Sequence, residues 1–254
     1  MKYKALEMRC SANGGGFGEF GGGEKRALCF PVYGILYFIF YILYLTPTVV
    51  SAQPVLMRDI FAAMPDSILP LVTKNNRLDC IDFIENNMEA KVRNRMDSYV
   101  TLEALTPNYL RFRTSASAFI EMRSLTWHPN DTTSTQIVAL VRTAEGGIGD
   151  MAVRHSNLTF ITPDWKPLPL SFEAPALNAF FTGTLSDSTL VEPARLAQRS
   201  LQYFQSVQLR LSADEETLTC MLQTGDLSRD ERRAALQLVQ PVVLHWDGTK
   251  FVRR

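Results

Sequence analysis

At Val100-Thr101-Leu102-Glu103-Ala104-Leu105 the hydrophobic pattern of this chain changes from helical spacing to a period of two. Pro107-Asn108 follows, and then Tyr109-Leu110-Arg111-Phe112-Arg113 alternates again. Alternation of apolar and polar residues is typical of a half-buried β-strand, and a Pro-Asn pair between two such runs indicates a turn. The stretch therefore predicts two antiparallel strands, and a sheet begins here.

The same alternation predicts three more strands downstream, at residues 119–126, 136–143 and 157–162. We expect His128-Pro129-Asn130-Asp131 to form the turn between the first two of these strands, because Pro, Asn and Asp favour turns. The first half of the chain is thus expected to contain a meander of antiparallel strands.

Two helices are predicted upstream of this meander, within residues 54–64 and 75–88, where apolar side chains recur at helical spacing. In the second helix we expect Leu78, Ile81 and Ile84 to hold the helical hairpin against the sheet. Helices packed on an antiparallel sheet define the α+β class.

The second half of the chain alternates at residues 207–211, 216–224 and 242–246, and a helix is predicted from Pro193 to Phe204. Residues 216–224 match the pattern of residues 135–143, which favours two imperfect tandem helix/sheet repeats. A further helix is predicted from a capping box and the apolar residues after it: Ser228, Glu231, Ala234, Leu236 and Val239.

We therefore predict an α+β fold with an N-terminal helical hairpin followed by antiparallel sheets. The expected organisation is a Gly-rich leader and signal peptide at 1–52, a first α+β unit at 53–168, a connecting segment with a helix at 169–206, and a second sheet unit at 207–254.

The leader carries the features of an export signal. Lys25-Arg26 precedes an uncharged run from Ala27 to Leu45, and Val50 and Ala52 place small residues around Ser51. Basic residues, an apolar stretch and a small-x-small site are typical of a secretory signal cleaved between Ala52 and Gln53. The apolar run is long enough to span a bilayer, so an uncleaved anchor in the inner membrane is the alternative to a periplasmic or secreted protein.

The charge balance after the leader argues against nucleic acid as a partner. The 254 residues hold 26 Lys+Arg and 26 Asp+Glu, and removing the five basic and three acidic residues of the first 52 leaves 21 and 23. Nucleic-acid-binding domains normally carry a basic surplus. The membrane is expected as a partner only through an uncleaved signal segment.

No catalytic, metal-binding or cofactor-binding motif emerges from the sequence. His128, His155 and His245 lie far apart, and neither H-E-x-x-H nor G-x-S-x-G occurs. The remaining cysteines after the leader, Cys80 and Cys220, are expected to be buried free thiols, with a disulfide as the alternative.

Three tryptophans stand near predicted strand ends: Trp127, Trp165 and Trp246. Packing in the core is the favoured interpretation of these rings, and a shared binding face is the alternative.

Two blocks of the sequence resemble the opening of a secreted Bacteroidales family, domain of unknown function 3256. They are Met57-Arg58-Asp59-Ile60-Phe61-Ala62-Ala63-Met64-Pro65-Asp66-Ser67-Ile68-Leu69-Pro70 and Asn76-Arg77-Leu78-Asp79-Cys80-Ile81-Asp82-Phe83-Ile84-Glu85-Asn86-Asn87-Met88. The resemblance implies a cleaved signal and an exported domain, and it carries over no catalytic residue.

We expect an exported envelope protein that binds a protein, peptide or glycan without catalysis, and the alternative is an envelope polymer hydrolase. The resemblance also implies O-glycosylation at Asp-Ser/Thr sites, for which this chain offers Thr132, Ser188 and Ser67. Thr132 is the best candidate, because it stands at a predicted hairpin apex. Ser67 is the weakest, because Ile68 and Leu69 are expected to turn inward and bury it.

Overall fold

A computed structural model of the chain describes residues 53–130, 132–147, 152–203 and 205–254. Gln53–Arg254 forms one unit by its internal contacts. The unit begins with two helices, α2 (Met57–Ala62) and α3 (Lys74–Glu85). Thr73 caps α3: its hydroxyl accepts from the Asn76 N–H at 3.1 Å, and its own N–H donates to Asn76 Oδ1 at 3.0 Å.

The buried residues of α3 are Arg77, Cys80 and Ile81, and Ile84 is half-buried, so the stripe differs from the predicted one. Ile81 is buried as expected, but Leu78 is 42% exposed, and Arg77 is buried in its place. The Arg77 guanidinium donates to the carbonyl oxygens of Val72 and Met64 and to the Asp66 carboxylate. These bonds compensate most of its loss of hydration, although its Nε has no partner among the described residues. A charged side chain thus occupies an inward position that the hydrophobic pattern assigns to leucine.

Six antiparallel strands form the first sheet in sequence order, and they contain the predicted meander. The strands are β1 (Lys91–Arg93), β2 (Tyr99–Leu105), β3 (Tyr109–Ser115), β4 (Ala118–Asn130), β5 (Thr133–Gly146) and β6 (Val153–Ile161). The short edge strand β1 was not expected from the sequence. The turn predicted at His128–Asp131 is wrong, because β4 continues through His128 to Asn130, which pairs with Thr133.

The second sheet has four antiparallel strands in the order β10-β9-β8-β7. They are β7 (Val207–Leu211), β8 (Thr217–Leu222), β9 (Val242–Trp246) and β10 (Phe251–Val252), and the first three match the predicted strands closely. A segment with two short 3₁₀ turns, η2 (Leu177–Ala179) and η3 (Ser188–Leu190), leads into α4 (Val191–Tyr203) before this sheet.

Helix α5 (Arg229–Leu238) connects β8 to β9 and begins at the predicted capping box, in which the Ser228 N–H donates to Glu231 at 3.0 Å. The predicted apolar stripe holds only in part: Ala234 is buried as expected, but Leu236 is 65% exposed and its neighbour Ala235 is buried in its place. Helices precede the first sheet, whereas α5 interrupts the second, so the internal repeat stays a prediction.

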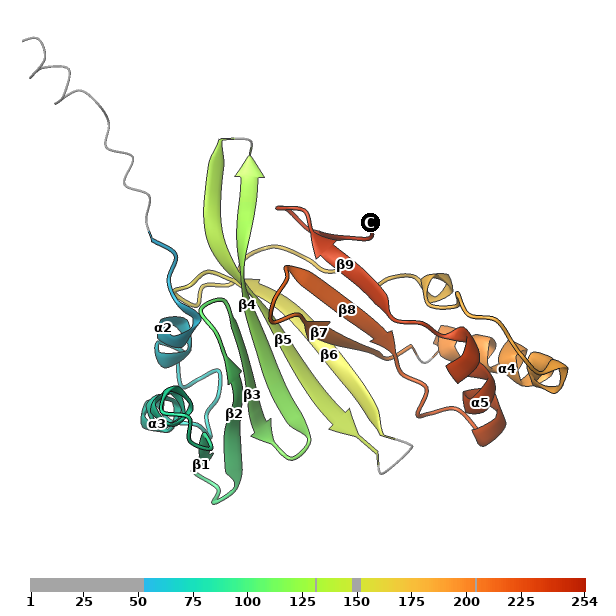
Figure 1. The fold of residues 1–254 in the computed structure, drawn as a ribbon, viewed down its shortest axis with the longest axis horizontal. Helices are drawn as coiled ribbons and strands as arrows, with labels where there is room; N and C mark the ends of the chain where they lie inside the picture. The colour runs from blue at the N-terminus through green and yellow to red at the C-terminus, as the bar shows by residue number, and fades with distance from the viewer. Residues whose placement is uncertain (1–52, 131, 148–151, 204) are drawn as a thin grey trace, which may run out of the picture. The chain divides into compact units, whose positions relative to one another are not determined.

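The first sheet separates two hydrophobic cores, and strand β5 contributes side chains to both. Its residues alternate between two buried clusters, with Val138 and Leu140 on one face and Ile137, Ala139 and Val141 on the other. The first cluster, the helix-side core, lies between the first sheet and helices α2 and α3. The second, the inter-sheet core, lies between the first sheet and β7–β9, with α4 and α5 contributing at its end (Figure 1).

Within the described ranges, no helix combines the length and apolar character needed to cross a bilayer.

Candidate binding groove

The candidate site lies along the outer edge of β6, the last strand of the first sheet. Arg154 N–H donates to Gln223 Oε1 at 3.1 Å, and Arg154 C=O accepts from Ser206 Oγ at 3.3 Å. Phe160 C=O accepts from Leu168 N–H at 2.9 Å. Backbone groups alternate in direction along an antiparallel strand. The even-numbered residues of β6 therefore direct their N–H and C=O groups away from β5.

Ser156 and Leu158 stand between these occupied positions, and their outward N–H and C=O groups have no partner in the described part of the chain. Arg154 and Phe160 close the edge on either side of them. The result is a window of two unpaired residues on the outer edge of β6.

Strand β7 presents a second edge of the same kind. Ser206 C=O accepts from Gln223 N–H, so the even-numbered residues bond toward β8. The odd-numbered residues point the other way, and Leu211 N–H donates to Glu121 Oε2 at 3.3 Å on the first sheet. Val207 and Leu209 face the same direction without a backbone partner among the described residues.

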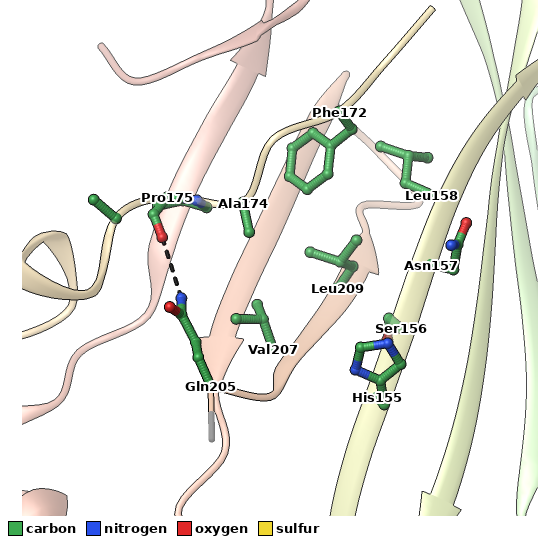
Figure 2. Close-up of a pocket in the computed structure, with 11 residues that line it drawn as sticks. His155, Ser156, Asn157, Leu158, Phe172, Ala174, Pro175, Gln205, Val207 and Leu209 are labelled. Carbon is green, nitrogen blue, oxygen red and sulfur yellow. Dashed lines mark hydrogen bonds between the residues drawn. The ribbon is translucent and has the colours of Figure 1, made fainter. Parts of the chain in front are cut away.

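A cavity of about 430 Å³, the edge groove, separates these two strand edges (Figure 2). Its lining comes from β6, from residues 172–176 and from the start of β7: His155, Ser156, Asn157, Leu158, Phe172, Ala174, Pro175, Ala176, Gln205, Val207 and Leu209. In Figure 2, Leu158, Phe172 and Leu209 point toward one another, which gives the groove an apolar centre.

A strap, residues 169–176, runs along the groove. Leu168 N–H fixes its start on Phe160, and Gln205 Nε2 donates to Pro175 C=O at 3.4 Å near its end. Phe172 packs edge-on against Phe251 at 6.5 Å between ring centroids. Between these points, within the segments that the structure describes, the strap makes no backbone–backbone hydrogen bond.

A second cavity of about 360 Å³ continues beneath the strap and shares Leu158 and Phe172 with the edge groove. Arg142 also lines this cavity, directly opposite Asn157 across the β5–β6 ladder. Its guanidinium is exposed, and it makes no ion pair with a described residue.

The groove also contains a histidine next to a hydroxyl. His155 Nδ1 lies 3.5 Å from Ser206 Oγ, and that hydroxyl also donates to Arg154 C=O. A nucleophilic serine needs a base that takes its proton and a group that orients the base. Among the described residues, no carboxylate contacts His155, so the pair lacks the third member of a triad.

A buried ion cluster fixes β7 over the first sheet, and with it the shape of the groove. Glu121 of β4 has no exposed surface and accepts from Tyr109 Oη at 2.9 Å, from Arg111 Nη1 at 2.7 Å and from Leu211 N–H. Burial raises the pKa of Glu121 above its ordinary value, and the Arg111 charge and the bond from Tyr109 oppose this shift. Arg111 also donates to Glu103 at 2.6 Å.

Arg123 makes the second link from β4 to the second sheet. It donates to the carbonyl oxygens of Ser212 at 2.9 Å and Asp214 at 3.3 Å. Burial lowers the pKa of its guanidinium, and the nearby carboxylates of Glu216 and Asp214 act in the opposite direction. Sequence reasoning missed this cluster, although Glu and Arg at alternate positions of a long strand are the signal that points to it.

The three tryptophans do not form a common surface. Trp165 is buried in the helix-side core and donates to Ile60 C=O at 2.8 Å, whereas Trp246 is buried in the inter-sheet core and donates to Thr126 C=O at 2.6 Å. Trp127 is half-buried against the inter-sheet core. Trp165 and Trp246 thus pack in the core. They lie on opposite faces of the first sheet, so they do not share one binding face.

The histidines and cysteines are also dispersed. His128 lies on β4, where its N–H donates to Gly248 C=O, and His245 is on β9. Within the described ranges, no three His, Cys, Asp or Glu side chains are grouped as metal ligands. Cys80 and Cys220 are buried free thiols, as favoured by the sequence, and burial raises the pKa of each to about 12.

The predicted modification sites lie on the surface. Thr132 and Ser188 are exposed, at the β4–β5 connection and in η3. Ser67 is exposed too, contrary to our expectation, because Ile68 and Leu69 turn inward without covering it. At the signal cleavage site, Gln53 is exposed, and Ala52 lies outside the described residues.

Fold and groove together define an α+β protein in which helices cover one face of a six-stranded antiparallel sheet and a four-stranded sheet packs on the other. The chain belongs to the family described as Protein of unknown function (DUF3256), which matches residues 49–251. This confirms the resemblance in the two N-terminal blocks.

A solved structure shares the fold. It is described as a domain of an uncharacterized protein from Porphyromonas gingivalis W83, with 23% sequence identity and a TM-score of 0.58. The match covers 78% of this chain and 96% of that one. No curated protein matches the sequence.

Proposed function

We propose that this chain is an exported binding module of the cell envelope that holds a protein, peptide or glycan in the edge groove without catalysis. The observation that supports this proposal most directly is the cavity of about 430 Å³ between two unpaired strand edges. Ligand sites in proteins are concave, with an apolar lining and a few polar groups that fix orientation. Leu158, Phe172 and Leu209 supply the apolar part, and the free backbone groups supply the polar part.

The proposed export is supported by three features of the sequence: the basic pair Lys25-Arg26, the apolar run after it and the small residues before Gln53. The periplasm or the exterior is the proposed location, with an anchor in the inner membrane as the alternative. The two sheet units, proposed as imperfect repeats, supply the two walls of the groove.

Site-specific photo-crosslinking tests the binding function. A photoreactive phenylalanine analogue at Asn157 in the groove is compared with the same analogue at Val243, which is 45% exposed on β9. We expect one dominant adduct from Asn157 in the native host, and its loss when Phe172→Asp is added. Equal adducts from both positions, or none from Asn157, would contradict the proposal.

An envelope polymer hydrolase is the second candidate function, and the contact between His155 and Ser206 favours it. A fluorophosphonate probe distinguishes the two. Covalent labelling of Ser206 that is lost in His155→Ala would support the hydrolase, whereas unlabelled protein is expected for a binding module.

A further inference from the structure

We propose that the ligand of the edge groove is an extended polypeptide segment that adds to the first sheet as a strand on the outer edge of β6. This inference rests on the proposed binding function and specifies its partner.

The hydrogen-bonding groups of the window match a β-strand. Ser156 and Leu158 each offer one N–H and one C=O, and two residues of strand separate these pairs by about 6.6 Å. A second strand presents complementary groups at the same repeat, which is the basis of recognition by strand addition. A sugar chain has hydroxyl groups but no such alternating donors and acceptors at this spacing.

Apart from the strap beside it and the charged Arg154, strand β6 lacks the features that normally protect an edge. Natural edge strands are short, charged, bulged or interrupted by proline. The opposite edge of the same sheet follows this rule, since β1 has three residues and carries Lys91 and Arg93. By contrast, β6 has nine residues, contains no proline and pairs with β5 without a register shift, whereas the β2–β3, β3–β4 and β4–β5 pairs each contain one.

The closed ends of the window set the length of the segment. The Arg154 and Phe160 positions are occupied by contacts from Ser206, Gln223 and Leu168. Three or four residues of a peptide thus pair with β6, and the cavities of about 430 and 360 Å³ on either side of Leu158 receive their side chains.

The two faces of the added strand have different surroundings. On one face, a peptide side chain opposite Leu158 meets Phe172 and Leu209, which favours an apolar residue. On the other face, the peptide side chain opposite Asn157 lies in the same cross-strand row as Asn157 and Arg142. Because Arg142 has no ion-pair partner among the described residues, charge complementarity favours Asp or Glu here. The expected segment alternates acidic and apolar residues.

Peptide selection followed by N-methyl scanning tests the inference. A phage-displayed library of random nine-residue peptides is selected on the full chain, and the best binder is synthesised with one N-methyl group at each position in turn. Strand addition predicts that methylation of alternate amides weakens binding about tenfold, as expected for loss of a hydrogen bond plus steric exclusion, while the amides between them change less than twofold. The protein is unchanged in this scan, so misfolding cannot mimic the pattern.

Two protein variants locate the bound peptide. Arg142→Glu is expected to weaken the selected peptide at least tenfold, and Arg210→Glu, a matched exposed arginine on β7, is expected to leave it unchanged. Loss of affinity that does not alternate along the peptide, or equal effects of the two variants, would overturn the inference.

Chitohexaose is the parallel probe for a glycan. Binding of chitohexaose that Phe172→Asp abolishes, with no peptide selected, would overturn the polypeptide partner and leave the binding function standing. If neither probe binds, the polypeptide inference fails, and the crosslinking from Asn157 decides the binding function separately.

Discussion

Replacement of Glu121 by alanine is expected to destabilise the protein strongly, because it removes the acceptor shared by both sheets. The carboxylate has no exposed surface and receives bonds from Tyr109, Arg111 and Leu211. Removing one partner of a buried ion pair costs about 3–5 kcal/mol. Arg111 keeps its bond to Glu103, but the Tyr109 hydroxyl and the Leu211 N–H both lose their acceptor. For a folded unit of about 200 residues this corresponds to a fall in Tm of about 6–20 °C.

The matched control is Glu145→Ala, which removes an ion pair with Arg154 at the surface. Exposed pairs of this kind contribute about 0–1 kcal/mol. Urea unfolding of both variants measures the difference in the free energy of unfolding. If Glu121→Ala costs no more than Glu145→Ala, β7 is not held on the first sheet by this cluster, and our account of the groove wall is wrong.

The pH dependence gives a second readout on the same residue. Burial raises the pKa of Glu121 in the folded protein above its ordinary value of 4.5, so the folded state binds this proton more tightly than the unfolded state. The resulting stabilisation is present below pH 4.5 and is lost as the pH rises through the folded-state pKa. Glu121→Gln cannot titrate, so its stability relative to the wild type should improve from pH 4 to pH 7. A constant or opposite difference would contradict the raised pKa.

Three further predictions concern other parts of the chain. Ile81→Ala should cost about 2–5 kcal/mol, because the side chain is 3% exposed, whereas Leu78→Ala, at 42% exposed, should cost less than about 0.5 kcal/mol in the same urea titration. The exported form is expected to begin at Gln53, and an intact mass that retains residues 27–45 would show a signal anchor instead. Thr132 is expected to carry an O-glycan in the native host, and glycopeptide mass spectrometry that recovers this peptide only in unmodified form would refute that.

Most strands could be predicted from the sequence because their hydrophobic pattern has a period of two. Residues 207–211 alternate cleanly, residues 242–246 are rich in β-branched and aromatic side chains, and the structure has strands at both positions. The hydrophobic pattern was misleading where a polar group is buried with partners. Arg77 replaces Leu78 in the core because three acceptors from other segments surround its guanidinium, and no local pattern contains those acceptors.

The groove could not be predicted from the sequence for a similar reason. Whether the N–H groups of Ser156 and Leu158 are paired depends on which strand lies beside β6, and that is a property of the sheet order. The tryptophans give no indication of the groove either, since Trp165 and Trp246 donate their indole N–H groups to backbone carbonyls inside the two cores. Buried tryptophan and surface tryptophan have the same pattern in the sequence.

Amide hydrogen exchange along β6 tests the open edge most directly. The account predicts alternation in the free protein: the outward amides of Ser156 and Leu158 exchange fast, and the amides of Asn157 and Thr159, which face β5, exchange slowly. A bound polypeptide strand should then slow exchange at Ser156 and Leu158. Slow exchange at all four amides in the free protein would contradict the account, because it would show that the edge is already paired.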